Sequence, residues 1–133
     1  EISEAYIKRI CEKNNYQYLR EANAISIKEK FGYDVPVDKS SRRYDFAINA
    51  PNGLTLVEVN YYGGGGSKLK STAGEYRNLH DVLNGQYKFV WITDGAGWKT
   101  TARPLRETFD HNDYLINLEL LENGVLEELL KSV

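Results

Sequence analysis

The stretch that decides the fold runs from Tyr44 to Tyr62 and reads YDFAINAPNGLTLVEVNYY. Aliphatic, β-branched and aromatic residues dominate its two halves, and the Pro-Asn-Gly between them is typical of a hairpin turn. A two-residue turn centred on Asn52 and Gly53 sets Pro51 opposite Leu54. The sequence therefore predicts two antiparallel strands in this register.

Acidic side chains interrupt both strands of the predicted hairpin. In this register Ala47 lies opposite Glu58, which places Asp45 diagonal to Glu58 on one face of the sheet. The other face is predicted to be an apolar layer, made of Tyr44, Phe46, Ile48, Val57, Val59 and Tyr61. A three-residue loop would shift the pairing by one residue and send Asp45 and Glu58 to opposite faces.

Two neighbouring carboxylates repel each other and raise each other's pKa unless a cation lies between them. Mg²⁺ prefers oxygen ligands and commonly binds one or two carboxylates together with water and phosphate. Asp45 and Glu58 are therefore candidate metal ligands, and a phosphodiester is the substrate that such a site suits. The alternative is that Glu58 is neutralised by Arg42, Arg43 or Lys68.

The rest of the chain alternates between helical and strand patterns. We expect helices over 3–14 and 24–31, a helix that begins near a capping box formed by Thr72 and Glu75 and ends at Gly85, and a terminal helix over 125–133. Further strands are predicted over 87–93 and 114–120. This order predicts an α/β fold in which helices flank a mixed β-sheet, with residues 1–133 as one domain.

Composition narrows the class of protein. Of the 133 residues, 41% are hydrophobic and 27% are charged, and no apolar run approaches the length of a membrane span. The net charge is −2, but charge is distributed unevenly along the chain. The segment from Ser67 to Arg106 contains seven basic and three acidic residues, whereas the segment after Arg106 contains seven acidic residues and one lysine. A basic middle segment can face phosphates, or both segments can be solvated surface.

The lone Cys11 excludes an internal disulfide and is interpreted as a buried thiol in a reducing compartment.

Four blocks of sequence together resemble a known family of enzymes. YDFAINA, EVNYY, GSKL and WITDGAGW, in this order and spacing, are similar to the DpnII/MboI family of type II restriction endonucleases, within the PD-(D/E)xK nuclease superfamily. The likeness runs from about Arg42 to the C-terminus and is weaker before Arg42. It implies Mg²⁺-dependent cleavage of duplex DNA at GATC by a cytoplasmic prokaryotic enzyme, of which this chain would be the C-terminal, nuclease-bearing portion. A palindromic site also implies a homodimer.

The resemblance assigns roles to individual residues. Asp45 and Glu58 fall on the metal ligands. Asn60 falls where the PD-(D/E)xK pattern usually has lysine. An amide carries no positive charge, so Lys68 is the candidate for the missing cation, and otherwise Asn60 hydrogen-bonds the attacking water. Glu4 resembles a helical glutamate that some of these nucleases direct at the metal, although solvated surface is the simpler interpretation.

Basic residues in and after the glycine run are candidates for binding DNA. Gly63–Gly66 does not match a nucleotide-binding P-loop, because serine separates the last glycine from Lys68. Lys68, Lys70 and Arg77 are expected to contact the DNA backbone, and Lys99 and Arg103 belong to a predicted DNA-facing loop.

Two alternative functions stay open. One is a non-catalytic DNA-binding domain in which Asn60 marks lost chemistry, and the other is a nuclease of the same fold that serves repair or junction resolution.

Overall fold

A computed structural model describes residues 2–61, 66–83, 86–94, 114–116 and 121–131. Five of its elements form one sheet: β1 (Gln17–Ala22), β2 (Tyr44–Ala50), β3 (Gly53–Tyr61), β4 (Lys88–Asp94) and β5 (Tyr114–Ile116). The strand order is β1-β2-β3-β4-β5. β2 is antiparallel to both β1 and β3, whereas β4 runs parallel to β3 and β5 parallel to β4. The predicted mixed sheet is confirmed.

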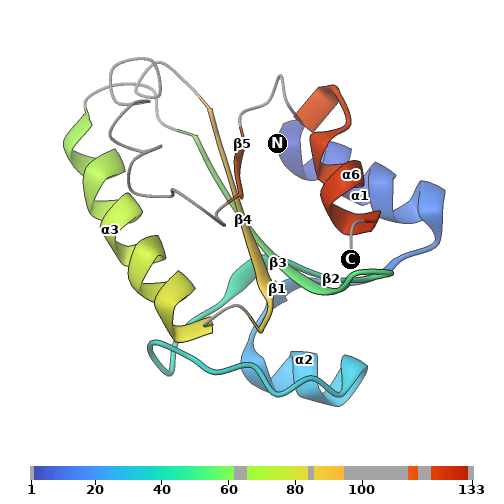
Figure 1. Cartoon of the computed structure of the whole chain (residues 1–133), viewed down its shortest axis with the longest axis horizontal. Coiled ribbons are helices and arrows are strands. Elements are labelled where there is room, and N and C mark those ends of the chain that lie inside the picture. Colours follow the sequence, from blue (N-terminus) through green and yellow to red (C-terminus); the bar gives the residue numbers. More distant parts are fainter. Residues whose placement is uncertain (1, 62–65, 84–85, 95–113, 117–120, 132–133) are drawn as a thin grey trace.

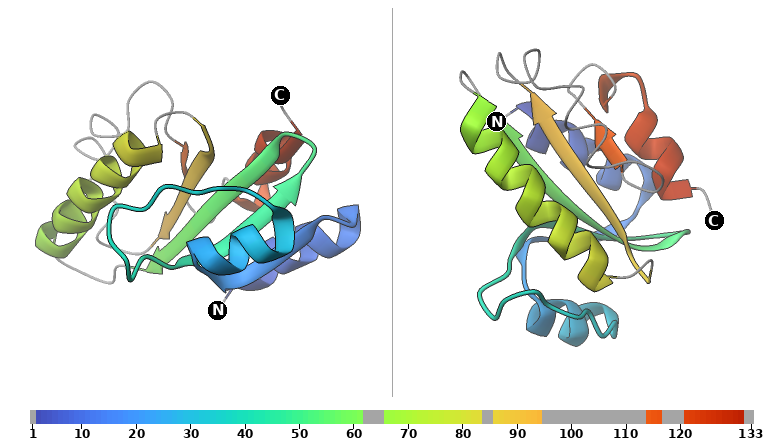
Figure 2. Two further views of the ribbon diagram at one scale, coloured as in Figure 1. Left: turned by 90° about the horizontal axis from the view of Figure 1, so that it is seen from below. Right: turned by 60° about the vertical axis from the view of Figure 1, so that its left-hand side comes forward.

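Helices cover both faces of the sheet. α3 (Gly66–Leu83) lies on one face, and α1 (Ile2–Asn14) and α6 (Val125–Lys131) lie on the other, as Figure 1 shows. α2 (Ala24–Phe31) lies near one end of the sheet (Figure 2). The arrangement is a three-layer α/β sandwich, as the order of elements predicted.

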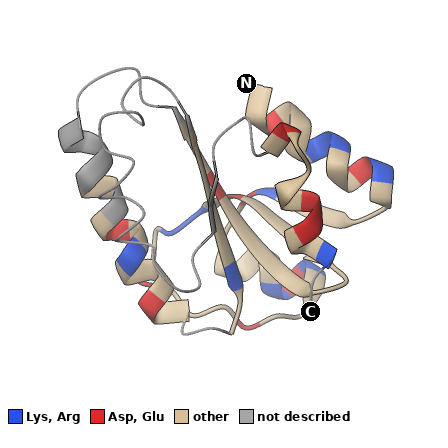
Figure 3. Cartoon of the chain, turned by 45° about the horizontal axis from the view of Figure 1, so that its top comes forward, with Lys and Arg blue, Asp and Glu red and all other residues tan. Residues whose placement is uncertain are grey.

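Two apolar clusters fill the space between the sheet and its helices. The α3-side cluster consists of Ala22, Ile27, Val35, Tyr44, Ala47, Leu54, Leu56, Tyr76, Leu79, Leu83, Phe89 and Trp91. The α1-side cluster consists of Ile7, Ile10, Cys11, Phe46, Ile48, Val57, Val90, Ile92, Leu121, Leu126 and Leu130. Charged side chains lie mainly on the helices and loops, and the strands are largely uncharged (Figure 3). Cys11 is fully buried, which confirms its interpretation as a packing thiol.

The predicted helix boundaries are right in the first part of the chain and wrong at α3. α2 begins after Asn23, whose side chain accepts from the Ser26 N–H while the Ser26 hydroxyl accepts from the Asn23 N–H, and it ends at Gly32 in a left-handed conformation. α3 already begins at Gly66, so Thr72 lies inside the helix and is no N-cap. The predicted end at Gly85 lies outside the described residues. β1 was not predicted.

The predicted register of the hairpin is wrong by two residues. Ala50 pairs with Gly53, so the turn is formed by Pro51 and Asn52 rather than by Asn52 and Gly53. The Asn52 side-chain amide donates to the Leu129 carbonyl at 2.6 Å, and its backbone N–H donates to the Leu130 carbonyl, so α6 holds this turn. A shift of two residues does not by itself move a side chain to the other face, because side chains alternate with a period of two.

One side chain of the predicted apolar layer lies on the wrong side. Phe46 belongs to the α1-side cluster as expected, but Tyr44 belongs to the α3-side cluster. The partner strand changes face at the same place: Arg20 lies over the Phe46 ring, whereas Ala22 packs with Tyr44. Glu21 lies between them with φ of 49°, a left-handed conformation that interrupts the alternation.

Candidate active site

The β2–β3 ladder ends where the two carboxylates begin. The last residue pair is Phe46 and Val57, and Asp45 and Glu58 are the next residues of the two strands beyond it. There the Asp45 N–H donates to Glu58 Oε1 at 2.9 Å, and the Val59 N–H donates to Asp45 Oδ2 at 2.7 Å. Each carboxylate is thus bound to the backbone of the other strand. The two predicted metal ligands therefore lie at one junction, linked by these two hydrogen bonds.

Burial makes the negative charge of this junction costly. Glu58 is only 9% exposed. Its pKa rises from 4.5 to about 7, first because burial disfavours the charged form and then because of the negative charge of Asp45. Burial also raises the pKa of Asp45, assisted by the charges of Glu4 and Glu21, whereas the hydrogen bond from the Val59 N–H lowers it.

No described lysine, arginine or histidine forms an ion pair with Asp45 or Glu58. Arg42 is buried, but it is held by Asp38 through two hydrogen bonds of 2.9 and 2.7 Å and by Glu75 at 2.7 Å. The alternative in which Arg42 neutralises Glu58 through a direct contact is therefore wrong. Arg42 only lowers the pKa of Glu58 weakly from a distance.

Asn60 is held in one orientation by its neighbours. Its Oδ1 accepts a hydrogen bond from the Trp91 indole N–H at 2.8 Å. Because an indole N–H is a donor only, it must face the carbonyl oxygen of the amide. The Asn60 NH₂ group therefore points away from Trp91 as a donor.

Tyr76 of α3 is a site residue that the sequence did not reveal. Its hydroxyl lies 2.8 Å from Glu58 Oε2 and 3.2 Å from Asn60 Oδ1. The sequence predicted Tyr76 only as an apolar position of a helix. Its helical spacing carried no sign that its hydroxyl reaches a strand residue 18 positions earlier.

Among the other predicted residues, Glu4 lies near enough to Asp45 for its charge to raise the pKa of that carboxyl. Glu4 forms an ion pair with Arg20, and no described group of three or more His, Cys, Asp or Glu residues is placed to hold a metal ion. Arg77 is exposed on α3, and Lys68 and Lys70 lie on the same helix, but their side chains are outside the described part of the chain. Lys99 and Arg103 also lie outside it.

The residues at the junction fit a divalent cation. Asp45 and Glu58 supply hard oxygen ligands, and burial is the main cause of their raised pKa values. Two buried hydroxyl groups nearby lack a hydrogen-bond partner within the described structure. Tyr44 is close enough for Glu58 to influence its pKa, and Thr93 is the register partner of Asn60 on β4. Such groups suit a polar ligand or ordered water.

Comparison with known proteins adds an independent observation. A family model described as DpnII restriction endonuclease matches residues 1–128. The chain is 44% identical to type II restriction enzyme MjaIII of Methanocaldococcus jannaschii, covering 97% of this chain and 47% of that enzyme. It is 42% identical to type II restriction enzyme LlaDCHI of Lactococcus lactis subsp. cremoris, covering 98% and 44%, respectively.

A third relative, type II restriction enzyme DpnII of Streptococcus pneumoniae, is 37% identical over 83% of this chain and 40% of that enzyme. The chain thus spans about half the length of the curated relatives it matches. No solved structure matches it. Within the described residues, no helix has both the length and the apolar character needed to cross a membrane.

Proposed function

Since the chain belongs to the DpnII restriction endonuclease family, we propose that it is the nuclease-bearing portion of a type II restriction endonuclease. The proposed reaction is hydrolysis of phosphodiester bonds in duplex DNA, at GATC as the family resemblance implies. Residues 1–133 form a single nuclease domain in this proposal, which acts in the cytoplasm of a prokaryote as a homodimer. Two-fold symmetry suits a palindromic DNA site.

The observation that carries the proposal is the pair formed by Asp45 and Glu58. Glu58 is buried and Asp45 is partly buried at one strand junction, and both have raised pKa values, without a cationic side chain bound to either in the described structure. In this proposal the two residues hold Mg²⁺, which when bound polarises a phosphoryl oxygen and lowers the pKa of water. Regular strands on both sides keep the ligands rigid.

Asn60 acts as a hydrogen-bond donor in the proposed reaction. Because Trp91 binds its carbonyl oxygen, the NH₂ group is directed away and is suited to hold the attacking water by its oxygen. An amide orients the water but does not remove its proton. The positive charge that lysine supplies in the usual pattern is assigned to Lys68 on α3.

The binding of DNA is assigned to the basic residues of the middle segment. Lys68, Lys70 and Arg77 lie on α3, the helix that also carries Tyr76. Lys99 and Arg103 complete the set proposed to contact phosphates. Contacts to phosphates supply affinity but carry no sequence information. The proposal therefore assigns no residue to the reading of the bases.

Cleavage assays with matched variants test the proposal. Duplex DNA that contains GATC is incubated with the protein and Mg²⁺, and the same duplex with the site scrambled serves as control. Glu58→Ala and Asp45→Asn should abolish cleavage, whereas Glu29→Gln, which alters an exposed carboxylate of α2, should cleave like the unmodified protein. Cleavage by Glu58→Ala at the unmodified rate would remove the proposed site.

The same assay separates the rival functions. Binding of the duplex without cleavage, with every metal tested, would favour the non-catalytic domain in which Asn60 marks lost chemistry. Cleavage of the scrambled duplex, or a preference for branched DNA, would favour a repair or junction-resolving nuclease.

A further inference from the structure

The Tyr76 hydroxyl lies within hydrogen-bond distance of two acceptors of the candidate site, Glu58 and Asn60, but it can donate only one proton. It is 2.8 Å from Glu58 Oε2 and 3.2 Å from Asn60 Oδ1. The Asn60 oxygen already accepts the Trp91 N–H at 2.8 Å. A carboxylate is also the stronger acceptor, and hydrogen bonds to charged groups are the shorter ones. The proton of Tyr76 is therefore donated to Glu58.

This hydrogen bond completes the fixation of the Glu58 carboxylate. Oε1 is held by the Asp45 N–H at 2.9 Å from β2, and Oε2 is held by Tyr76 from α3. Two donors from different elements set the plane of the carboxylate group. Each oxygen of a carboxylate has two lone pairs, so one on each oxygen stays available for a cation.

The Tyr76 ring is itself firmly placed. It is 4% exposed. It meets Phe89 at 5.3 Å and Trp91 at 5.0 Å between ring centroids, with interplanar angles of 72° and 89°. Edge-to-face packing on two sides holds the ring, and therefore the hydroxyl, in one position.

From this geometry we infer that Tyr76 is a positioning residue, which acts through Glu58 to orient the carboxylate for a divalent cation. The inference rests on the proposed function, because it takes Glu58 as a metal ligand. Tyr76 does not touch the reacting atoms. Residues that orient a metal ligand in this way typically change metal affinity by about 10–100-fold when they are removed.

Tyr76→Phe tests the inference because it deletes the hydroxyl and keeps the ring packing. Purified protein is titrated with Mn²⁺ alone, as a stand-in for Mg²⁺, and free Mn²⁺ is followed by electron paramagnetic resonance. Tyr76→Phe should weaken Mn²⁺ binding by about tenfold. Thermal unfolding of each metal-free variant is recorded in parallel, so that a loss of stability is seen separately.

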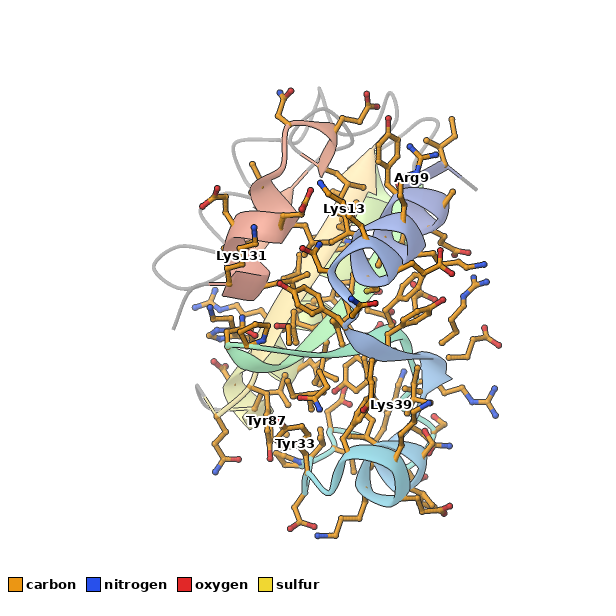
Figure 4. All side chains as sticks on the ribbon, turned by 90° about the vertical axis from the view of Figure 1, so that its right-hand side faces the viewer. Arg9, Lys13, Tyr33, Lys39, Tyr87 and Lys131 are labelled. Carbon is orange, nitrogen blue, oxygen red and sulfur yellow. The ribbon has the colours of Figure 1, made fainter. Side chains whose placement is uncertain are left out.

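Tyr87→Phe is the matched control. The Tyr87 hydroxyl also donates one hydrogen bond, to the Asp34 carbonyl at 3.0 Å, and its ring also packs edge-on, against Tyr33. Tyr87 precedes β4 and lies beside Tyr33 near α2 (Figure 4), whereas Glu58 pairs with Trp91 farther along the same strand. Tyr87→Phe should bind Mn²⁺ like the unmodified protein.

Glu58→Gln separates failure of this inference from failure of the proposed function. Mn²⁺ binding that survives Glu58→Gln unchanged would overturn the proposed metal site and the inference with it. Loss of binding in Glu58→Gln together with unchanged binding in Tyr76→Phe would overturn the inference alone. A lower melting temperature of Tyr76→Phe with unmodified Mn²⁺ affinity would likewise show that the hydroxyl serves only packing.

Discussion

Glu58→Gln should stabilise the metal-free protein above pH 7 while it abolishes the proposed catalysis. The folded protein holds the pKa of Glu58 at about 7, against an ordinary value of 4.5. Between these two values the folded state binds more protons than the unfolded state, so the free energy of unfolding falls as the pH rises. The loss is complete above pH 7 and absent below pH 4.5. Glutamine carries no charge at any pH and escapes this loss.

The size of the effect follows from the two pKa values. Their difference corresponds to about 3 kcal/mol, which is the largest gain expected for Glu58→Gln at pH 8. The hydrogen bonds at the site can adapt to glutamine. Its Oε1 accepts from the Asp45 N–H, and its amide donates to the Tyr76 oxygen, which frees the tyrosine proton for Asn60.

Urea unfolding of both proteins in EDTA, from pH 5 to pH 8.5, measures this difference. The stability of Glu58→Gln relative to the unmodified protein should increase with pH across this range. Mg²⁺ should stabilise the unmodified protein at pH 8 and leave Glu58→Gln unchanged, because only the former keeps the ligand. A variant that is equally or less stable than the unmodified protein at every pH would refute the reasoning.

Three further substitutions test the surroundings of the site. Arg42→Met should cost about 2 kcal/mol in urea unfolding because it leaves the partly buried Asp38 carboxylate without its two hydrogen bonds, whereas Arg43→Met on the surface should change stability by less than about 0.5 kcal/mol. Asn52→Ala removes the side-chain bond from the hairpin turn to α6 and should cost about 1 kcal/mol in the same assay, and no loss would contradict the structural role of this bond. Asn23→Ala removes the capping box of α2 and should lower stability by about 1 kcal/mol, and an unchanged melting temperature would argue against the cap.

The sequence predicted elements better than it predicted register. The periodicity of Ile7, Ile10 and Cys11 located α1, and alternation located β2 and β3, because these patterns reflect burial on one face. β1 was missed because its burial does not alternate cleanly. The turn was misplaced because Asn-Gly favours one local geometry, whereas bonds from Asn52 to α6 support another. Long-range contacts of this kind leave no local signature.

Asp45 and Glu58 could be proposed from the sequence because a carboxylate inside an apolar strand is unusual, and this pattern is visible without a structure. Tyr76 could not, since a tyrosine on the buried face of a helix satisfies the apolar pattern whether or not its hydroxyl has a function. The neighbouring Glu75 binds Arg42 just before β2, while Tyr76 binds Glu58 on β3. Consecutive residues of α3 therefore hold both strands of the junction. A substitution that displaces α3 should disturb both attachments together, even where it touches neither carboxylate.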